Sequence, residues 1–107
     1  MTDQPGPSFI TTLTHLRATK NGPQGRDSRC VGFLNSFDEA KKAVEVNAGD
    51  INEAGTFPLC VIETMSEGIY PVARNTAWFA WNVDAGGYRE ISGPPEDLKQ
   101  ICGFSIG

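Results

Sequence analysis

The alternation of apolar and polar positions predicts a first strand over residues 8–19, "SFITTLTHLRAT". In an extended chain, Phe9 and Leu13 fall on one side of this segment, and Ile10 and Thr12 fall on the other. Its many β-branched residues favour a strand over a helix. We therefore expect the first element of the domain to be a strand whose two faces are packed differently.

A hairpin with a long tip follows from the next two segments. Residues 20–28 are polar and rich in turn formers, which predicts a loop, and "RCVGFLN" (residues 29–35) predicts a returning strand. Residues 1–7 hold two prolines, one glycine and no apolar anchor. We expect them to form a loose tail before a single domain that spans residues 8–107.

The segment "SFDEAKKAVEVNAGD" (residues 36–50) carries the pattern of a capped helix. The Ser36 hydroxyl can accept a hydrogen bond from the backbone N–H of Glu39, whose carboxylate can reach back, as in a capping box. Residues 47–49 supply the stop signal. Three apolar residues fall on one side of this helix: Phe37, Ala40 and Val44.

Strand patterns dominate the rest of the chain. Residues 56–65 contain a continuous apolar run after an early proline, which predicts a central strand. Residues 69–83 predict one strand broken by Pro71, or two short strands. "DAGG" (residues 84–87) is a hairpin signal, after which residues 88–92 are expected to pair back.

The order of these elements predicts an α+β domain. A prolyl start and two acids in the first turn predict a short C-terminal helix over residues 95–101. We therefore expect an antiparallel sheet of four to six strands, with the main helix across one face and the short helix at the end of the chain.

Composition excludes several classes of function. The chain has 107 residues, a size typical of one domain, and a net charge of −4, which disfavours a protein that wraps duplex nucleic acid. No segment is long and apolar enough to predict a membrane span. Cys30, Cys60 and Cys102 lack a C-x-x-C pairing, and the single histidine, His15, is distant. We therefore expect reduced thiols in a cytoplasmic protein and no metal site.

The stretch "ARNTAWFAWN" (residues 73–82) holds both tryptophans. Alternation in a strand places Trp78 on the face opposite Phe79 and Trp81. We expect Phe79 and Trp81 in the core, which leaves Trp78 for contact with a ligand, a partner or a loop. A guanidinium, an amide and a ring can together hold a nucleotide. The candidate ligand-binding residues are Arg74, Asn75 and Trp78, joined by Arg26 or Arg29 from the first hairpin or from a second subunit.

Catalytic groups are not marked by spacing. His15 is the one ordinary general base, and no carboxylate or nucleophile is placed to work with it. Ser36 is explained by its capping role. We therefore expect a binding protein rather than an enzyme, with no catalytic residues and no cofactor.

Residues 30–82 resemble a family of small uncharacterised domains from phages and bacteria. The resemblance is carried by "GF" followed by apolar residues, "SFDEA", "NAGDI", "VIE", "EGIYP" and "WFAW", and "FSIG" near the C-terminus fits the same style. The family implies no activity that can be transferred. Small phage domains of this size often act by binding, and some are anti-defence sponges, including inhibitors of Thoeris and CBASS immunity.

Two functions are therefore predicted. The first is a phage-encoded sponge that sequesters a small anionic nucleotide signal, such as a cyclic oligonucleotide or cyclic ADP-ribose, in the cytoplasm of the host cell. The second is an interaction module that inhibits a host protein through the face that carries Trp78. A homo-oligomer is expected in both cases, because one main helix cannot cover two large sheet faces.

Overall fold

The computed structural model describes residues 5–14, 17–19, 22–24, 28–65 and 73–95. Within these residues the chain forms seven strands, one α-helix and one 3-10 turn. In chain order they are β1 (Pro5–Leu13), β2 (Arg17–Thr19), β3 (Gly22–Gln24), β4 (Ser28–Ser36), α1 (Phe37–Glu45), η1 (Ala48–Asp50), β5 (Leu59–Met65), β6 (Ala73–Asn82) and β7 (Gly87–Ile91).

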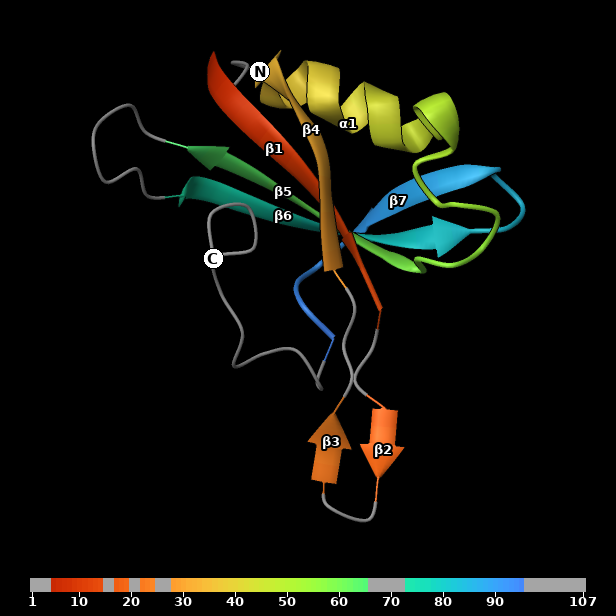
Figure 1. Ribbon diagram of the computed structural model, residues 1–107. Helices are drawn as coiled ribbons and strands as arrows, with labels where there is room; N and C mark the ends of the chain where they lie inside the picture. The colour runs from red at the N-terminus through yellow and green to blue at the C-terminus, as the bar shows by residue number, and fades with distance from the viewer. Residues whose placement is uncertain (1–4, 15–16, 20–21, 25–27, 66–72, 96–107) are drawn as a thin grey trace.

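Five of the strands form one antiparallel sheet in the order β4-β1-β5-β6-β7, and α1 lies across one face of it (Figure 1). The α+β class, the strand count and the single main helix are thus confirmed. The short helix predicted over residues 95–101 lies almost entirely outside the described residues.

The first hairpin is formed, but it is more elaborate than predicted. β1 pairs with β4 and extends from Pro5, so residues 5–7 join the sheet rather than the expected loose tail. β1 ends at Leu13, and the predicted loop contributes β3, which pairs with β2 in a separate two-stranded sheet. This small hairpin projects away from the main sheet (Figure 1).

The capped helix occurs as predicted. The backbone N–H of Glu39 donates to Ser36 Oγ at 3.3 Å, and Ala40 and Val44 are fully buried beneath the helix. The helix ends at Glu45, and Asn47 takes a left-handed conformation with φ of 51°. An asparagine tolerates this conformation better than most residues, so it stops the helix as the sequence indicates.

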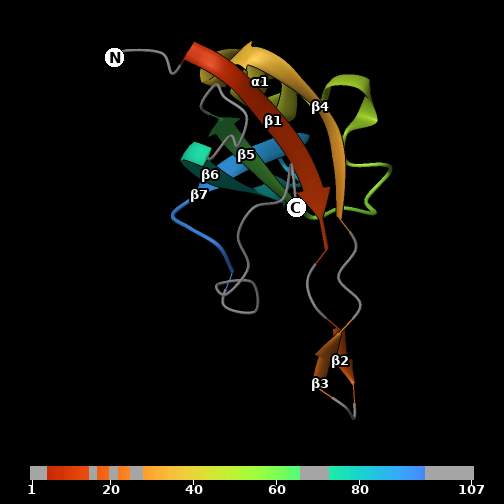
Figure 2. The same cartoon turned by 60° about the vertical axis from the view of Figure 1, so that its left-hand side comes forward.

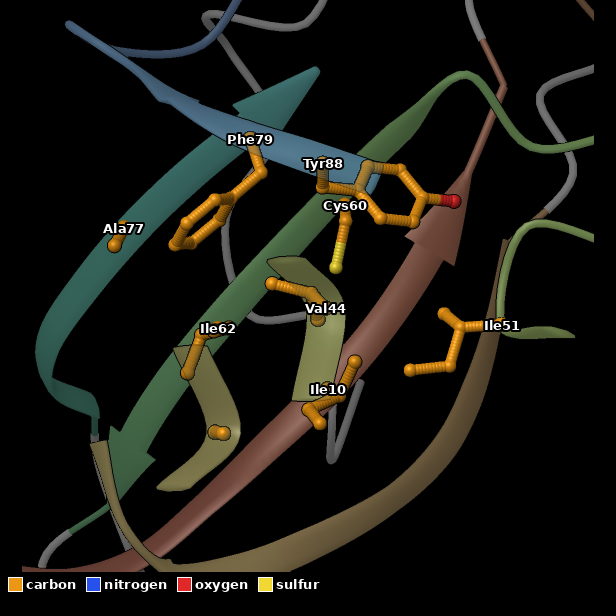
Figure 3. Close-up of a cluster of buried hydrophobic side chains, with 9 residues drawn as sticks. Ile10, Val44, Ile51, Cys60, Ile62, Ala77, Phe79 and Tyr88 are labelled. Carbon is orange, nitrogen blue, oxygen red and sulfur yellow. The ribbon is translucent and has the colours of Figure 1, made fainter. Parts of the chain in front are cut away.

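The main core lies between α1 and the sheet. Its buried residues on the strands include Ile10, Cys60 and Phe79, which define the helix face of the sheet (Figure 3). A second buried cluster lies on the opposite face, here called the far face, and consists of Leu13, Leu59, Val61 and Trp78. All seven residues of β5 are buried because this central strand is covered on both faces. The prediction of a central strand is confirmed.

The predicted second hairpin joins β6 to β7, and its turn spans residues 83–86, one residue earlier than the expected 84–87. Gly87 begins β7 directly against the end of α1, where a Cβ atom would lie 1.8 Å from the carbonyl oxygen of Glu45. Only glycine permits this approach without a shift of backbone. The end of the helix is therefore fixed on the start of the last described strand.

Candidate functional site

A pocket of about 580 Å³ lies between β4 and the segment that follows α1. This volume is within the range that small-molecule sites occupy. Apolar side chains from β1, β4 and the end of η1 form most of the wall, and one basic and one acidic residue join them. The lining residues are Ile10, Arg29, Val31, Gly32, Phe33, Leu34, Ala48, Gly49, Asp50 and Ile51.

Residues 47–57, here called the asparagine loop, form the wall opposite β4. Asn52 is 3% exposed, and its Nδ2 donates to the carbonyl oxygen of Phe57 at 2.9 Å. Its backbone N–H donates to Asn47 Oδ1, also at 2.9 Å, and its Oδ1 accepts from the N–H of Gly55. Two asparagine side chains thus replace the backbone pairing that a loop lacks. These hydrogen bonds fix the conformation of this pocket wall.

The backbone of this loop is unusual. Four of its residues other than glycine have positive φ: Asn47 (51°), Asp50 (57°), Glu53 (53°) and Ala54 (54°). Each such conformation costs roughly 1–2 kcal/mol, and it persists only where the surroundings determine it. The side-chain bonds of Asn47, Asp50 and Asn52 supply that determination.

Arg29 is the basic residue of the pocket. Its Nη1 donates to Glu53 Oε1 at 2.7 Å, and its guanidinium lies 5.2 Å from the ring centroid of Phe57. The side chains of Arg29 and Glu53 are 42% and 46% exposed. An ion pair at such exposure contributes about 0–1 kcal/mol. Glu53 therefore holds the guanidinium in place but can be exchanged for another anion at little cost.

Asp50 is the acidic residue of the pocket, and its carboxylate is engaged within the loop. Asp50 Oδ1 accepts from Asn47 Nδ2 and from the backbone N–H of Ala54, both at 3.3 Å. A carboxylate that organises a loop in this way is poorly placed to act as a general base. Among the described residues, no group of three histidine, cysteine, aspartate or glutamate side chains could hold a metal ion.

One tyrosine anchors the far end of the asparagine loop. Tyr88 is fully buried, and its hydroxyl donates to the carbonyl oxygen of Phe57 at 2.7 Å. Burial raises the pKa of Tyr88 to about 12, and a hydrogen bond with Asn52 opposes part of this shift. The hydroxyl therefore stays neutral at physiological pH and donates throughout. The loop is thus tied to β7 as well as to Arg29 of β4.

The structure does not bring the predicted binding residues together. Arg29 lies at the pocket, Arg26 is outside the described residues, and Arg74 and Asn75 belong to β6. β1 and β5 separate β4 from β6, which corresponds to roughly 14 Å across the sheet. Arg29 is level with Phe79 through the pairing of the strands, so Arg74 is displaced by about 17 Å along β6 as well. Within one chain, the backbone positions of Arg29 and Arg74 are therefore separated by about 22 Å.

Trp78 does lie on the face opposite Phe79, as alternation predicts, but it does not lie at the surface. It is 6% exposed and packs with Leu13, Leu59 and Val61. The ring is therefore buried in a cluster of the far face rather than exposed, and its expected contact with a ligand, a partner or a loop stays a prediction. Phe79 is fully buried as predicted, whereas Trp81 is only partly buried and packs against the edge of the main core.

The asparagine loop is the part of the site that the sequence did not reveal. Its turn-forming residues predict only the end of the helix at residues 47–49 and a connection to the next strand. The signal that could have found it is the spacing of Asn47 and Asn52, two residues whose side chains can each satisfy a backbone group.

Comparisons of this chain with protein-family models, with curated proteins and with solved structures find no match. The resemblance of residues 30–82 to phage domains therefore stays a prediction. Within the described part of the chain, no helix is long and apolar enough to cross a membrane. His15, the one candidate for a general base, lies outside the described residues.

Proposed function

We propose that this chain is a non-enzymatic binding protein that sequesters a small anionic ligand of the nucleotide class in the pocket between β4 and the asparagine loop. The observation that carries the proposal is Arg29, a half-exposed guanidinium at a pocket with apolar walls, held by a carboxylate that a ligand can replace. In biological terms, the protein would be encoded by a phage and would block a signal of the host cell.

The charges around the pocket limit the ligand. Arg29 is balanced by Glu53 and accompanied by Asp50, so the surroundings do not favour several negative charges at once. One phosphodiester oxygen could replace Glu53 and accept from Arg29, while a planar base packs against Ile51 and Val31. A cyclic nucleotide with one charge at each phosphodiester fits this arrangement better than a linear triphosphate.

The lining residues also support binding without catalysis. Asp50 is committed to hydrogen bonds within the asparagine loop, and Arg29 has no acid–base role at neutral pH. A ligand held by one exchangeable ion pair and by apolar contacts would be retained rather than converted. Sequestration therefore requires only that the protein be abundant relative to the signal.

Calorimetric titration with cyclic dinucleotides, cyclic trinucleotides and cyclic ADP-ribose isomers tests the proposal. Arg29→Gln should weaken binding of the responding ligand by roughly 10- to 150-fold, because a charged hydrogen bond is lost. Glu53→Gln should strengthen binding, because the competing carboxylate is removed. Lys42→Gln changes the net charge equally but lies on α1, so it should leave the affinity unchanged.

Two results would change the conclusion. If Arg74→Gln weakens binding and Arg29→Gln does not, the ligand site lies on β6, where the sequence placed it. If no ligand of the panel binds more tightly than about 1 mM, which corresponds to roughly 4 kcal/mol, the nucleotide proposal is wrong. The alternative function, inhibition of a host protein through the Trp78 face, would need a buried ring to become accessible, so no observation favours it.

A further inference from the structure

The two edges of the five-stranded sheet differ in how they are protected. β7 is five residues long and carries Arg89 and Glu90, and Pro94 and Pro95 follow it closely. Short length, charge and nearby proline are devices that prevent a sheet edge from pairing with another chain. β4, at the other edge, is nine residues long and contains neither proline, lysine nor an acid. Among the described residues, no strand pairs with its outer side (Figure 2).

The middle of this edge also exposes a large apolar side chain. Phe33 is 56% exposed, although its ring lies 5.3 Å from that of Phe9 on the adjacent strand β1. The other large apolar residues this exposed in the described part of the chain are Val46 and Val83, and neither belongs to a strand. β4 has one bulged residue, Val31, where the register with β1 shifts between Ile10 and Thr11, and its edge is otherwise regular from Gly32 to Leu34. An exposed aromatic residue on an edge strand without proline, lysine or acids is typical of an interface.

We infer that β4 is the interface between two copies of this chain, which pair antiparallel through their β4 strands about a two-fold axis at Phe33. The residues on either side of Phe33 make the edge self-complementary. Gly32 pairs with Ile10 and Leu34 with Ser8, so both positions belong to the helix face. A two-fold axis at Phe33 places Leu34 of the second copy opposite Gly32 of the first. It also places Gly32 of the second copy opposite Leu34 of the first.

Gly32 offers the space that this pairing needs. A Cβ atom added at Gly32 would meet no atom within 4 Å, so the surface beside it is open. Leu34 of the second copy would fill that space, while the two Phe33 rings meet on the far face and extend the Phe9–Phe33 contact across the axis. The two edges therefore match on both faces of the sheet. On the helix face a large residue lies opposite a glycine, and on the far face two aromatic rings meet.

Charge is compatible with a second copy despite the net charge of −4. The one charged residue of β4, Arg29, is neutralised by Glu53 of its own chain. In this register Arg29 does not face another arginine, because the two copies of Arg29 are separated by about 27 Å along the strands. Gly32 also lines the pocket, so Leu34 of the second copy would form part of the pocket wall. The inference itself does not rest on the proposed ligand.

An edge of this length buries less than the roughly 1,200 Å² of a stable interface, so the dimer should dissociate on dilution. Light scattering after size exclusion should give a rising mass between about 1 and 300 µM protein, the range expected for weak complexes. Phe33→Asp should keep the protein monomeric throughout, because two carboxylates would meet at the axis. Val83→Asp removes an even more exposed apolar side chain, in the turn between β6 and β7 away from β4, and should leave the dimer intact.

Cross-linking tests the register directly. With Cys30 and Cys102 replaced by serine, Phe33→Cys should form a dimer-linking disulfide under mild oxidation, because paired positions at the axis lie within the 4.4–6.8 Å that a disulfide requires. Asn35→Cys is the matched control, since its two copies would lie about 14 Å apart along the strands. Melting curves confirm that each variant is folded. A monomer at every concentration, or cross-linking at residue 35 and not at residue 33, would overturn the inference.

Discussion

At the scale of single residues, the two tryptophans differ in burial in the opposite order to the one expected from alternation. Trp78 is 6% exposed within the far-face cluster, whereas Trp81 is partly buried and meets Tyr88 edge to face, with ring centroids 5.3 Å apart. Trp78→Ala should therefore lower the free energy of unfolding by about 3–5 kcal/mol, as for buried aromatic residues. Trp81→Ala should lower the free energy of unfolding by a smaller amount. Urea denaturation of both variants measures the order, and a larger loss at Trp81 would contradict it.

Two adjacent threonines on β1 provide a matched pair of substitutions. Thr11 is buried, and within the described structure its hydroxyl has no hydrogen-bond partner. Thr12 is equally buried, but its hydroxyl donates to the carbonyl oxygen of Arg29 at 3.5 Å. Valine has the same shape without the hydroxyl, so Thr11→Val should stabilise the protein by about 1 kcal/mol, and Thr12→Val should not. A stability gain at Thr12, or a loss at Thr11, in chemical denaturation would refute this explanation.

At the scale of elements, the packing of α1 against β7 depends on one missing side chain. A Cβ atom at Gly87 would overlap the carbonyl of Glu45, which is backbone and cannot turn aside. Arg89 also donates to that carbonyl at 3.1 Å, so a shift of the helix end would break this bond too. Gly87→Ala should therefore destabilise the protein by about 1–3 kcal/mol, the usual range for overpacking.

Gly93→Ala is the control for this substitution. Its Cβ atom would meet nothing within 4 Å, and we expect its melting temperature to equal that of the unmodified protein. Thermal melts followed by circular dichroism can compare the two variants. If both variants melt alike, the contact between α1 and β7 does not contribute to stability as the geometry indicates.

Elements whose signals are local could be predicted from the sequence. The cap at Ser36, the stop at Asn47 and the turn at residues 83–86 each depend on residues a few positions apart, and all three occur. The β2–β3 pair could not be predicted in the same way. Its six residues include the turn formers Gly22 and Pro23 and no large apolar side chain, so pairing between the two segments overrides their composition.

The candidate site was predictable only in part, for a related reason. Arg29 could be selected as a basic residue beside a loop, but its neighbours Glu53 and Phe57 are distant in the sequence and meet it only after the asparagine loop folds. The alternation of β6 correctly separates Trp78 from Phe79. It does not reveal whether the second face is covered, because that depends on residues elsewhere in the chain.

At the scale of the whole molecule, two buried acids make the fold sensitive to alkali. Burial raises the pKa of the Cys60 thiol far above its ordinary 9.0 and that of Tyr88 from 10.0 to about 12. Both groups are neutral in the folded protein at a pH where the unfolded chain has begun to ionise. The unfolded state therefore binds fewer protons, and stability falls as pH rises. The contribution is fully present below about pH 9 and is lost progressively above it.

Each group that ionises only in the unfolded chain lowers the free energy of unfolding by about 1.4 kcal/mol per pH unit. Urea denaturation between pH 8 and 11 should therefore show stability that declines from about pH 9 and more steeply above pH 10, when Tyr88 joins Cys60. Cys60→Ala should remove the first decline, whatever it costs in absolute stability through the lost side chain. Cys30→Ala removes an exposed thiol and should leave the profile unchanged. If Cys60→Ala and the unmodified protein lose stability in parallel from pH 8 to 10, the buried thiol is not the origin of the alkaline sensitivity.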